Sequence, residues 1–196
     1  MNFLAHCALG SASDALLVGG FLGDFVKGPV PPDLPIAIQD GIRLHRRLDA
    51  YSATDPDMRA SVARLPAELR RFAPPFVDLL ADHLLALDFA AQHGEPLGAF
   101  STRAYTAIDA HRRLLPAGAE RFFDAMRDFD LFERYRDFGS VGRTFARLMR
   151  RLDRDDVVAP MVERAAAQYD ALARDFAVYY PSLKRHADDW VAARVR

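Results

Sequence analysis

The chain has 196 residues, of which about half are apolar and about a quarter charged, and its formal net charge is −1. This length lets one domain bury a core without disulfides or a structural metal, and the composition is that of a globular protein. The near-neutral charge provides no overall field that would select nucleic acid or an anionic membrane. We therefore expect a single domain over residues 1–196 that binds neither.

The cysteine content and the hydrophobicity of the chain indicate the cellular compartment in which it acts. Cys7 is the only cysteine, which excludes an internal disulfide and a cysteine-based metal site and suits a reducing compartment. Residues 1–14 lack the basic leader and the long apolar core of a signal peptide. No apolar run approaches the roughly 20 residues that cross a bilayer. These features predict a soluble cytoplasmic protein.

The first two predicted helices carry one histidine and one aspartate. A short helix over residues 1–9 contains His6, and a second helix over residues 14–27 contains Asp24. Asp24 continues an apolar stripe at spacings of four and three residues, so its side chain should face inward.

Three glycines weaken the second helix. Gly19, Gly20 and Gly23 each lower its intrinsic stability by up to about 1 kcal/mol relative to alanine. Because a missing side chain lets another backbone or a ligand come close, we expect a close contact at this helix.

The helix predicted over residues 34–53 contains the segment GIRLHRRLDAY, in which His45 and Asp49 stand one turn apart. At about 100° per residue, both continue an apolar stripe that begins at Ile38. Burying an imidazole and a carboxylate costs free energy unless a partner satisfies them. A bound metal ion would satisfy both, and so would a hydrogen bond between them inside the core. The pair alone leaves both interpretations open.

Residues 76–92 are apolar nearly all round, which is typical of a central buried helix. Asp78 and Asp82 stand four residues apart on one face of it and repel each other where the effective dielectric is low. They therefore need a cation or protons. His83 points about 100° away from Asp82 and need not reach the same ion.

The rest of the chain is also predicted to be helical, because no alternating β pattern longer than a few residues interrupts it. The expected helices cover residues 56–65, 97–115, 118–129, 131–138, 141–152, 157–177 and 181–195. The fold class is therefore all-α. We interpret the histidines and arginine pairs of this half, including Arg150–Arg151, as core or solvated positions.

The candidate ligands are histidines and carboxylates without sulfur: His6, Asp24, His45, Asp49, Asp78, Asp82 and His83. Such a set suits Mn²⁺, Mg²⁺ or Fe²⁺ better than a structural zinc. An ion held this way lowers the pKa of bound water and neutralises charge on a phosphoryl oxygen, which is hydrolytic chemistry. The chain contains neither a Gly-x-Ser-x-Gly elbow nor a phosphate loop of the Gly-x4-Gly-Lys type.

Four motifs in order carry a family resemblance: MNFLAH, GGFLGDFVKG, GIRLHRRLDAY and DLLADHLL. At these spacings the chain resembles the bacterial acyl carrier protein phosphodiesterases, an all-helical branch of the HD phosphohydrolases. The motifs cover residues 1 to about 90, and the second half is similar mainly in length and helical character. The resemblance implies a single-domain helical bundle of the HD-phosphohydrolase type.

The resemblance implies hydrolysis of the phosphodiester that joins 4′-phosphopantetheine to a serine of holo-acyl carrier protein. The products are apo-carrier protein and free phosphopantetheine, and the divalent ion is typically Mn²⁺, with Mg²⁺ or Fe²⁺ as alternatives. The standard HD order of ligands is not reproduced, because the adjacent pair is reversed as Asp82–His83. The division between direct ligands and supporting residues therefore stays open.

Carried over position by position, the resemblance implies the candidates, and the role of each is our hypothesis. The direct ligands are Asp24, His45 and Asp82. The ligands or partners that orient ligands are His6, Asp49 and Asp78. His83 either protonates the leaving serine oxygen or orients a ligand. Because acyl carrier proteins are acidic and helical, we expect a local basic face near the site, with Lys27, Arg46 and Arg47 gripping phosphate or the partner.

Two other interpretations stay open. The same fold and metal could serve a nucleotide or another small phosphoester, since metal ligands do not read the leaving group. Alternatively, the chain is a non-enzymatic helical binding module whose His–Asp pairs are core hydrogen bonds. The second alternative predicts no bound metal and no effect of EDTA on the melting temperature.

Overall fold

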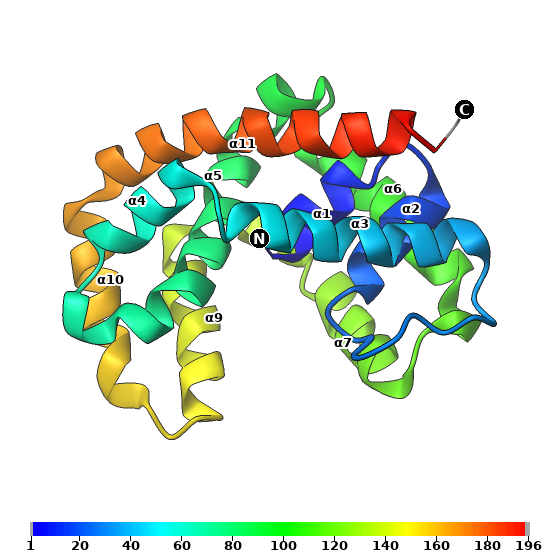
Figure 1. Cartoon of the computed structure of the whole chain (residues 1–196). Helices are drawn as coiled ribbons and strands as arrows, with labels where there is room; N and C mark the ends of the chain where they lie inside the picture. The colour runs from blue at the N-terminus through cyan, green and yellow to red at the C-terminus, as the bar shows by residue number, and fades with distance from the viewer. Residues whose placement is uncertain (1, 195–196) are drawn as a thin grey trace.

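The computed structural model describes residues 2–194, and all regular structure in that range is helical (Figure 1). The predicted all-α class is confirmed. The α-helices are α1 (Phe3–Leu9), α2 (Asp14–Leu22), α3 (Ile36–Ser52), α4 (Pro56–Arg64), α5 (Ala73–His93), α6 (Leu97–Ala110), α7 (Ala117–Asp128), α8 (Leu131–Arg134), α9 (Phe138–Arg150), α10 (Val158–Ala167) and α11 (Tyr169–Ala192). The 3₁₀ helices are η1 (Ala67–Phe72), η2 (Arg112–Leu114) and η3 (Asp155–Val157). The predicted helix ends at Met1 and Val195 lie outside the described residues.

Helix α5 is the central buried helix, as the sequence predicts. Its buried side chains include Phe76, Leu80, Leu85 and Phe89, and α1, α4, α9 and α11 pack against it. Within residues 2–194, no helix combines the length and the hydrophobicity that a membrane crossing needs.

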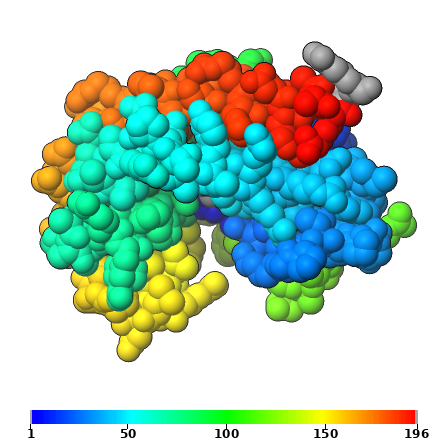
Figure 2. All heavy atoms as spheres, in the orientation of Figure 1, coloured from blue at the N-terminus to red at the C-terminus, as the bar shows by residue number. Residues whose placement is uncertain are grey.

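Helix α11 lies along the upper edge of the view in Figure 1, and α3 lies beneath it and contacts it. The other helices form two groups. Helices α4, α9 and α10 lie toward the left of the view, α2 and α7 lie toward the right, and α1 lies between the groups. The space-filling view is hollowed between the two groups, below α3 (Figure 2).

Glycines bring α1, α2 and α3 into backbone contact. A Cβ atom added to Gly41 of α3 would lie 2.4 Å from the Leu16 carbonyl oxygen and 2.7 Å from the Gly19 Cα. A Cβ atom added to Gly20 would lie 2.7 Å from the His6 carbonyl oxygen of α1. These positions admit no larger residue without a backbone shift, and the close approach expected at α2 is confirmed.

Helix α2 ends at Leu22 instead of at Lys27, so the predicted end is wrong. The Val26 amide bonds back to the Leu22 carbonyl (3.0 Å), and the Arg46 guanidinium donates to the Val26 carbonyl (2.8 Å). These two bonds stabilise a turn in place of another helical turn. Asp24 therefore lies in a turn that follows the helix rather than on the helix itself.

The predicted helix break before Pro181 is also wrong, because Pro181 lies inside α11 and the break falls at Gln168. Proline leaves the carbonyl four residues earlier without its helical donor. Buried Phe176, Tyr180 and Leu183 surround the position. Their packing outweighs this local cost.

We predict that Gly41→Ala lowers the free energy of unfolding by about 1–3 kcal/mol, because overpacking of a tight contact costs that much. Urea denaturation measures the change. The matched control is Gly118→Ala in α7, where an added Cβ meets nothing within 4 Å. The control should lose no stability. Equal stability of the two variants would contradict the close packing of α2 and α3.

Candidate metal centre and active site

Two buried histidines from different helices lie face to face. His6 of α1 and His45 of α3 are 2% and 3% exposed, and their ring centroids are 3.6 Å apart with an interplanar angle of 18°. An added Cβ at Gly23 would lie 2.2 Å from the His45 Cγ, so Gly23 leaves the room that the ring occupies. The glycine contacts that pack α1 and α3 against α2 therefore also bring the two imidazoles together.

The hydrogen bonding of His45 fixes which nitrogen faces the carboxylates. Its Nδ1 lies 2.8 Å from the Gly20 carbonyl oxygen, to which it donates. Its Nε2 lies 3.3 Å from Asp49 Oδ2 and 3.9 Å from Asp24 Oδ1. A histidine that binds a metal commonly donates its other ring N–H to a backbone carbonyl in this way. The Nε2 lone pair is thus directed at the carboxylates.

His6 is a buried imidazole without a hydrogen bond. Its Nε2 lies 3.1 Å from Asp49 Oδ1, but this contact lacks hydrogen-bond alignment, and neither ring nitrogen has a hydrogen-bond partner among the described residues. Burial, with a smaller effect of the neighbouring His45, lowers the pKa of His6 to about 3. At neutral pH the ring is therefore neutral, with a lone pair available to an ion.

Asp49 faces both histidines. Burial raises the pKa of Asp49, but the two facing imidazoles outweigh this effect and hold the pKa below its usual value. The carboxylate is therefore ionised at neutral pH. Its side chain is about half exposed, so the charge lies at the boundary between the buried rings and solvent.

His6, His45 and Asp49, here called the histidine cluster, fit a divalent ion. Each offers one ligand atom, and these three atoms lie within 4.8 Å of one another. The cluster combines two imidazoles with one carboxylate, a donor set that suits Mn²⁺, Fe²⁺ or Zn²⁺. The orphaned nitrogens of His6 are what such an ion would satisfy.

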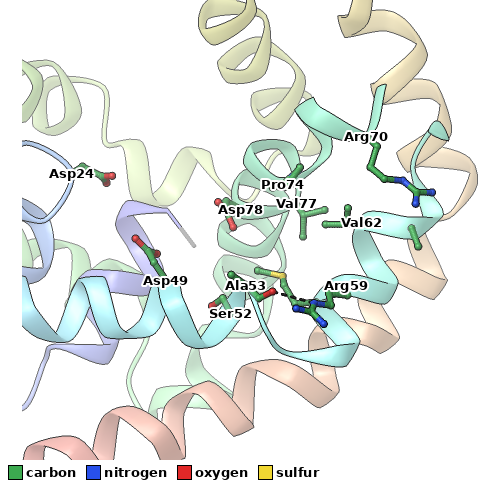
Figure 3. Close-up of a pocket in the computed structure, with 12 residues that line it drawn as sticks. Asp24, Asp49, Ser52, Ala53, Arg59, Val62, Arg70, Pro74, Val77 and Asp78 are labelled. Atoms are coloured by element: carbon green, nitrogen blue, oxygen red, sulfur yellow. Dashed lines mark hydrogen bonds between the residues drawn. The ribbon is translucent and has the colours of Figure 1, made fainter. Parts of the chain in front are cut away.

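Asp24 and Asp78 lie beside the histidine cluster at one end of a cleft, and Figure 3 shows Asp24, Asp49 and Asp78 around the same space. Burial raises the pKa of Asp24, against the effect of the neighbouring His45. Asp78 of α5 lies across the cleft from α3. The structure therefore brings together five of the predicted ligands: His6, Asp24, His45, Asp49 and Asp78.

Asp82 of α5 was predicted as a direct ligand, but its side chain instead contacts the N-terminal end of α1. Its side chain is fully buried, Oδ2 accepts from the Leu4 amide (2.9 Å), and Oδ1 accepts from the Ala5 amide (3.1 Å). Burial raises the pKa of Asp82 to about 7, and the two amides oppose this shift. Because His6 follows on the same short helix, Asp82 holds the backbone that carries His6.

His83 is engaged away from the histidine cluster. Its Nδ1 donates to the Tyr135 carbonyl (2.7 Å), and its Nε2 accepts from the Tyr169 hydroxyl (2.8 Å). Burial lowers the pKa of His83. Both nitrogens are occupied by these bonds, so the geometry does not support the expected transfer of a proton to the leaving group.

The three predicted basic residues do not line the cleft. Arg46 holds the turn after α2 through the Val26 carbonyl, and the Arg47 Nε donates to His186 Nε2 of α11 (3.0 Å). Lys27 is exposed beyond that turn. Spacing showed that Arg46 and Arg47 point away from His45. It could not show that the turn after α2 binds the first guanidinium group and α11 binds the second.

Two clefts meet at this site. The first, between α4 and α5, has a volume of about 500 Å³ and runs from Asp24, Asp49 and Asp78 to alkyl side chains and arginines (Figure 3). The second, beside α9, has a volume of about 350 Å³. Asp24 and Asp78 line both clefts. The carboxylates are therefore reachable from two directions.

The cleft residues that sequence reasoning did not assign to the site include Ser52, Arg70, Arg147 and Arg151. Ser52 stands three residues after Asp49, so extending the stripe of α3 by one turn would have found it. Arg147 and Arg151 stand four apart, but only the tertiary structure shows which face of a helix borders a cleft.

The comparisons with known proteins agree with the motifs. Residues 1–183 match the family model described as acyl carrier protein phosphodiesterase. The chain belongs to this family. Acyl carrier protein phosphodiesterases of Serratia proteamaculans and Enterobacter sp. (strain 638) are each 31% identical to it, over 96% and 93% of this chain and 98% and 95% of theirs. No solved structure matches the chain. The predicted family is confirmed, and the membership extends far beyond the 90 residues that carry the motifs.

We predict that Mn²⁺ raises the melting temperature of the wild-type protein and leaves that of His6→Ala unchanged. A ligand that binds only the folded state adds about 2.7 kcal/mol at a hundredfold excess over Kd. Differential scanning fluorimetry with and without EDTA measures the shift, and His111→Ala at the residue that follows α6 is the control. An equal shift in His6→Ala would show that the ion binds elsewhere.

A second prediction concerns Asp82. Asp82→Asn replaces one acceptor oxygen with an NH₂ group, leaving a buried amide of α1 without its acceptor, so the free energy of unfolding should fall by about 1–3 kcal/mol. Urea denaturation measures it, with Asp188→Asn at an exposed position of α11 as the control. No difference between the two variants would contradict the role of Asp82 in holding α1.

Proposed function

We propose that this protein is a metal-dependent phosphodiesterase that hydrolyses the 4′-phosphopantetheine–serine diester of holo-acyl carrier protein. The products are apo-acyl carrier protein and free 4′-phosphopantetheine. The observation that carries the proposal is the histidine cluster at the end of an open cleft, in a chain of the acyl carrier protein phosphodiesterase family. A pair of His–Asp hydrogen bonds in a closed core would not need access to solvent.

We assign the metal ligands to His6, His45 and Asp49, with Asp24 and Asp78 completing or supporting the site. Mn²⁺ is the ion that we propose, and Mg²⁺ and Fe²⁺ are the alternatives. When bound, the ion supplies a Lewis acid for a phosphoryl oxygen and lowers the pKa of water. Asp82 supports the site through α1.

The chain's own residues then position the reaction. An oxygen–phosphorus bond forms from water, the bond between phosphorus and the serine oxygen breaks, and the serine oxygen takes up a proton. Asp24 borders both clefts beside His45, where its carboxylate accepts the proton of the attacking water. The departing serine oxygen is protonated from solvent, because the open cleft gives water access and His83 is engaged elsewhere.

The proposal also covers the domain type, the cellular compartment and the kind of carrier protein that the sequence led us to expect. We propose that the whole chain acts as one domain of the HD-phosphohydrolase type, because its candidate ligands are histidines and aspartates mostly borne on helices. We also propose that it acts in the cytoplasm on an acyl carrier protein of fatty acid biosynthesis. The family membership supports the carrier protein as the substrate.

Mass spectrometry of holo-acyl carrier protein incubated with the purified protein and Mn²⁺ tests the function. We predict conversion to the apo form, loss of activity with EDTA, and recovery when Mn²⁺ is added back. Asp49→Asn and Asp24→Ala should lower kcat/KM by more than about 100-fold, since even an outer partner of a metal ligand is worth up to that much.

The control for these variants is His111→Ala, which changes a histidine outside both clefts and should keep wild-type activity. A wild-type protein that leaves holo-carrier protein intact with every divalent ion, but hydrolyses a nucleotide or another small phosphoester, would contradict the proposed substrate. A protein that binds no metal and hydrolyses neither substrate would contradict the enzyme assignment.

A further inference from the structure

A phosphodiester has two organic substituents, and the site has two clefts. The substituents leave the phosphorus atom in different directions, so an enzyme that holds both needs two paths from the reacting phosphate. The α4–α5 cleft and the α9 cleft share Asp24 and Asp78, and Asp49 of the histidine cluster lines the first of them. A monoester would need only one of these paths.

The α4–α5 cleft suits a slender, flexible chain. Beyond the carboxylates it is lined by small and alkyl side chains, including Val62 and Val77, with Arg59 and Arg70 at its far end (Figure 3). Ser52 lies on its wall near Asp49, and its buried hydroxyl has no hydrogen-bond partner among the described residues. A buried hydroxyl at a cleft wall is satisfied when a polar group of a ligand lies against it.

The α9 cleft suits a protein surface. Phe3 and Phe122, whose ring centroids are 4.4 Å apart, line it together with Leu131 and Leu148. Arg147 and Arg151 also line it. Aromatic side chains and arginines are the residues that protein–protein interfaces favour.

Arg147 and Arg151 differ from the arginines around them. Each of the other three arginines nearby forms an ion pair with an aspartate close to it in the sequence: Arg143 with Asp137, Arg150 with Asp155, and Arg154 with Asp156. Arg147 and Arg151 are exposed and form no ion pair with any residue in the range 2–194. Because they stand four residues apart, they project from the same side at the end of α9. Both guanidinium groups are therefore available to carboxylates of a partner.

We propose that the two clefts divide the substrate between them. The pantetheine arm lies in the α4–α5 cleft against Ser52, and an acidic surface of the carrier protein docks beside α9 on Arg147 and Arg151. This inference rests on the proposed function. It places the basic docking surface on the second half of the chain, whereas the sequence predicted it at Lys27, Arg46 and Arg47. Figure 2 shows the hollow between the yellow segment that includes α9 and the blue segment that follows α2.

Two substrates distinguish the roles of the two clefts. One is holo-acyl carrier protein, and the other is the methyl ester of 4′-phosphopantetheine, a diester that keeps the arm and lacks the protein. The double variant Arg147→Glu/Arg151→Glu should lower the ratio of kcat/KM for the carrier protein to kcat/KM for the methyl ester by at least about tenfold, mainly through KM for the carrier. Added salt should lower the same ratio in the wild type.

The matched control is Arg174→Glu/Arg185→Glu on α11, which changes the net charge equally at exposed positions outside both clefts. This control should keep the wild-type ratio. An equal fall in both double variants would mean that net charge acts at a distance, and an unchanged ratio in the α9 variant would mean that the carrier docks elsewhere. Either result overturns the docking surface.

Ala63→Trp tests the other cleft, because it places a large side chain at an exposed position on the cleft wall. It should lower kcat/KM for both substrates by at least about tenfold, since both contain the arm. Wild-type kinetics in Ala63→Trp would overturn the placement of the arm. If the wild-type protein hydrolyses neither substrate, the proposed function itself fails, whereas an active wild type with unaffected variants contradicts only the division of the substrate.

Discussion

Three helix backbones approach each other through glycine, and the site depends on this contact. Gly19 and Gly41 let α2 meet α3, and Gly20 lets α2 meet the backbone of α1 at His6. The Gly20 carbonyl also accepts the hydrogen bond that orients His45. One short stretch of α2 therefore sets the distance between the two imidazoles and the direction of one of them. A bulkier residue at these positions would move the ligands apart.

The histidine cluster is unfavourable for folding when it is considered alone. A buried imidazole without a hydrogen-bond partner costs about 1–3 kcal/mol, and His6 is such a group. Asp82 holds the same helix from the other side through two backbone amides, which keeps His6 in place. A divalent ion offsets the cost by using the lone pairs that the fold leaves unpaired. Metal binding and stability are thus linked through the same atoms.

Periodicity predicted what lies along one helix but not what lies between helices. The stripe of α3 placed His45 and Asp49 on the inward face, and the apolar segment over residues 76–92 identified the central helix. Asp82 shares a stripe with Asp78, yet it caps α1, because its partners are nearly 80 residues earlier in the chain. Pro181 looked like a helix break, but packing of α11 on the core outweighs its local cost. The arginines of α9 could be assigned to a cleft only when the fold was known.

Anomalous diffraction from a crystal of the protein soaked in Mn²⁺ tests the central claim most directly. The account predicts a manganese peak between the Nε2 atoms of His6 and His45 and the carboxylate of Asp49, at the point where the two clefts meet. A peak only at other residues, or no peak while the two imidazoles keep their stacked arrangement, would contradict the claim that these buried histidines exist to hold a metal ion.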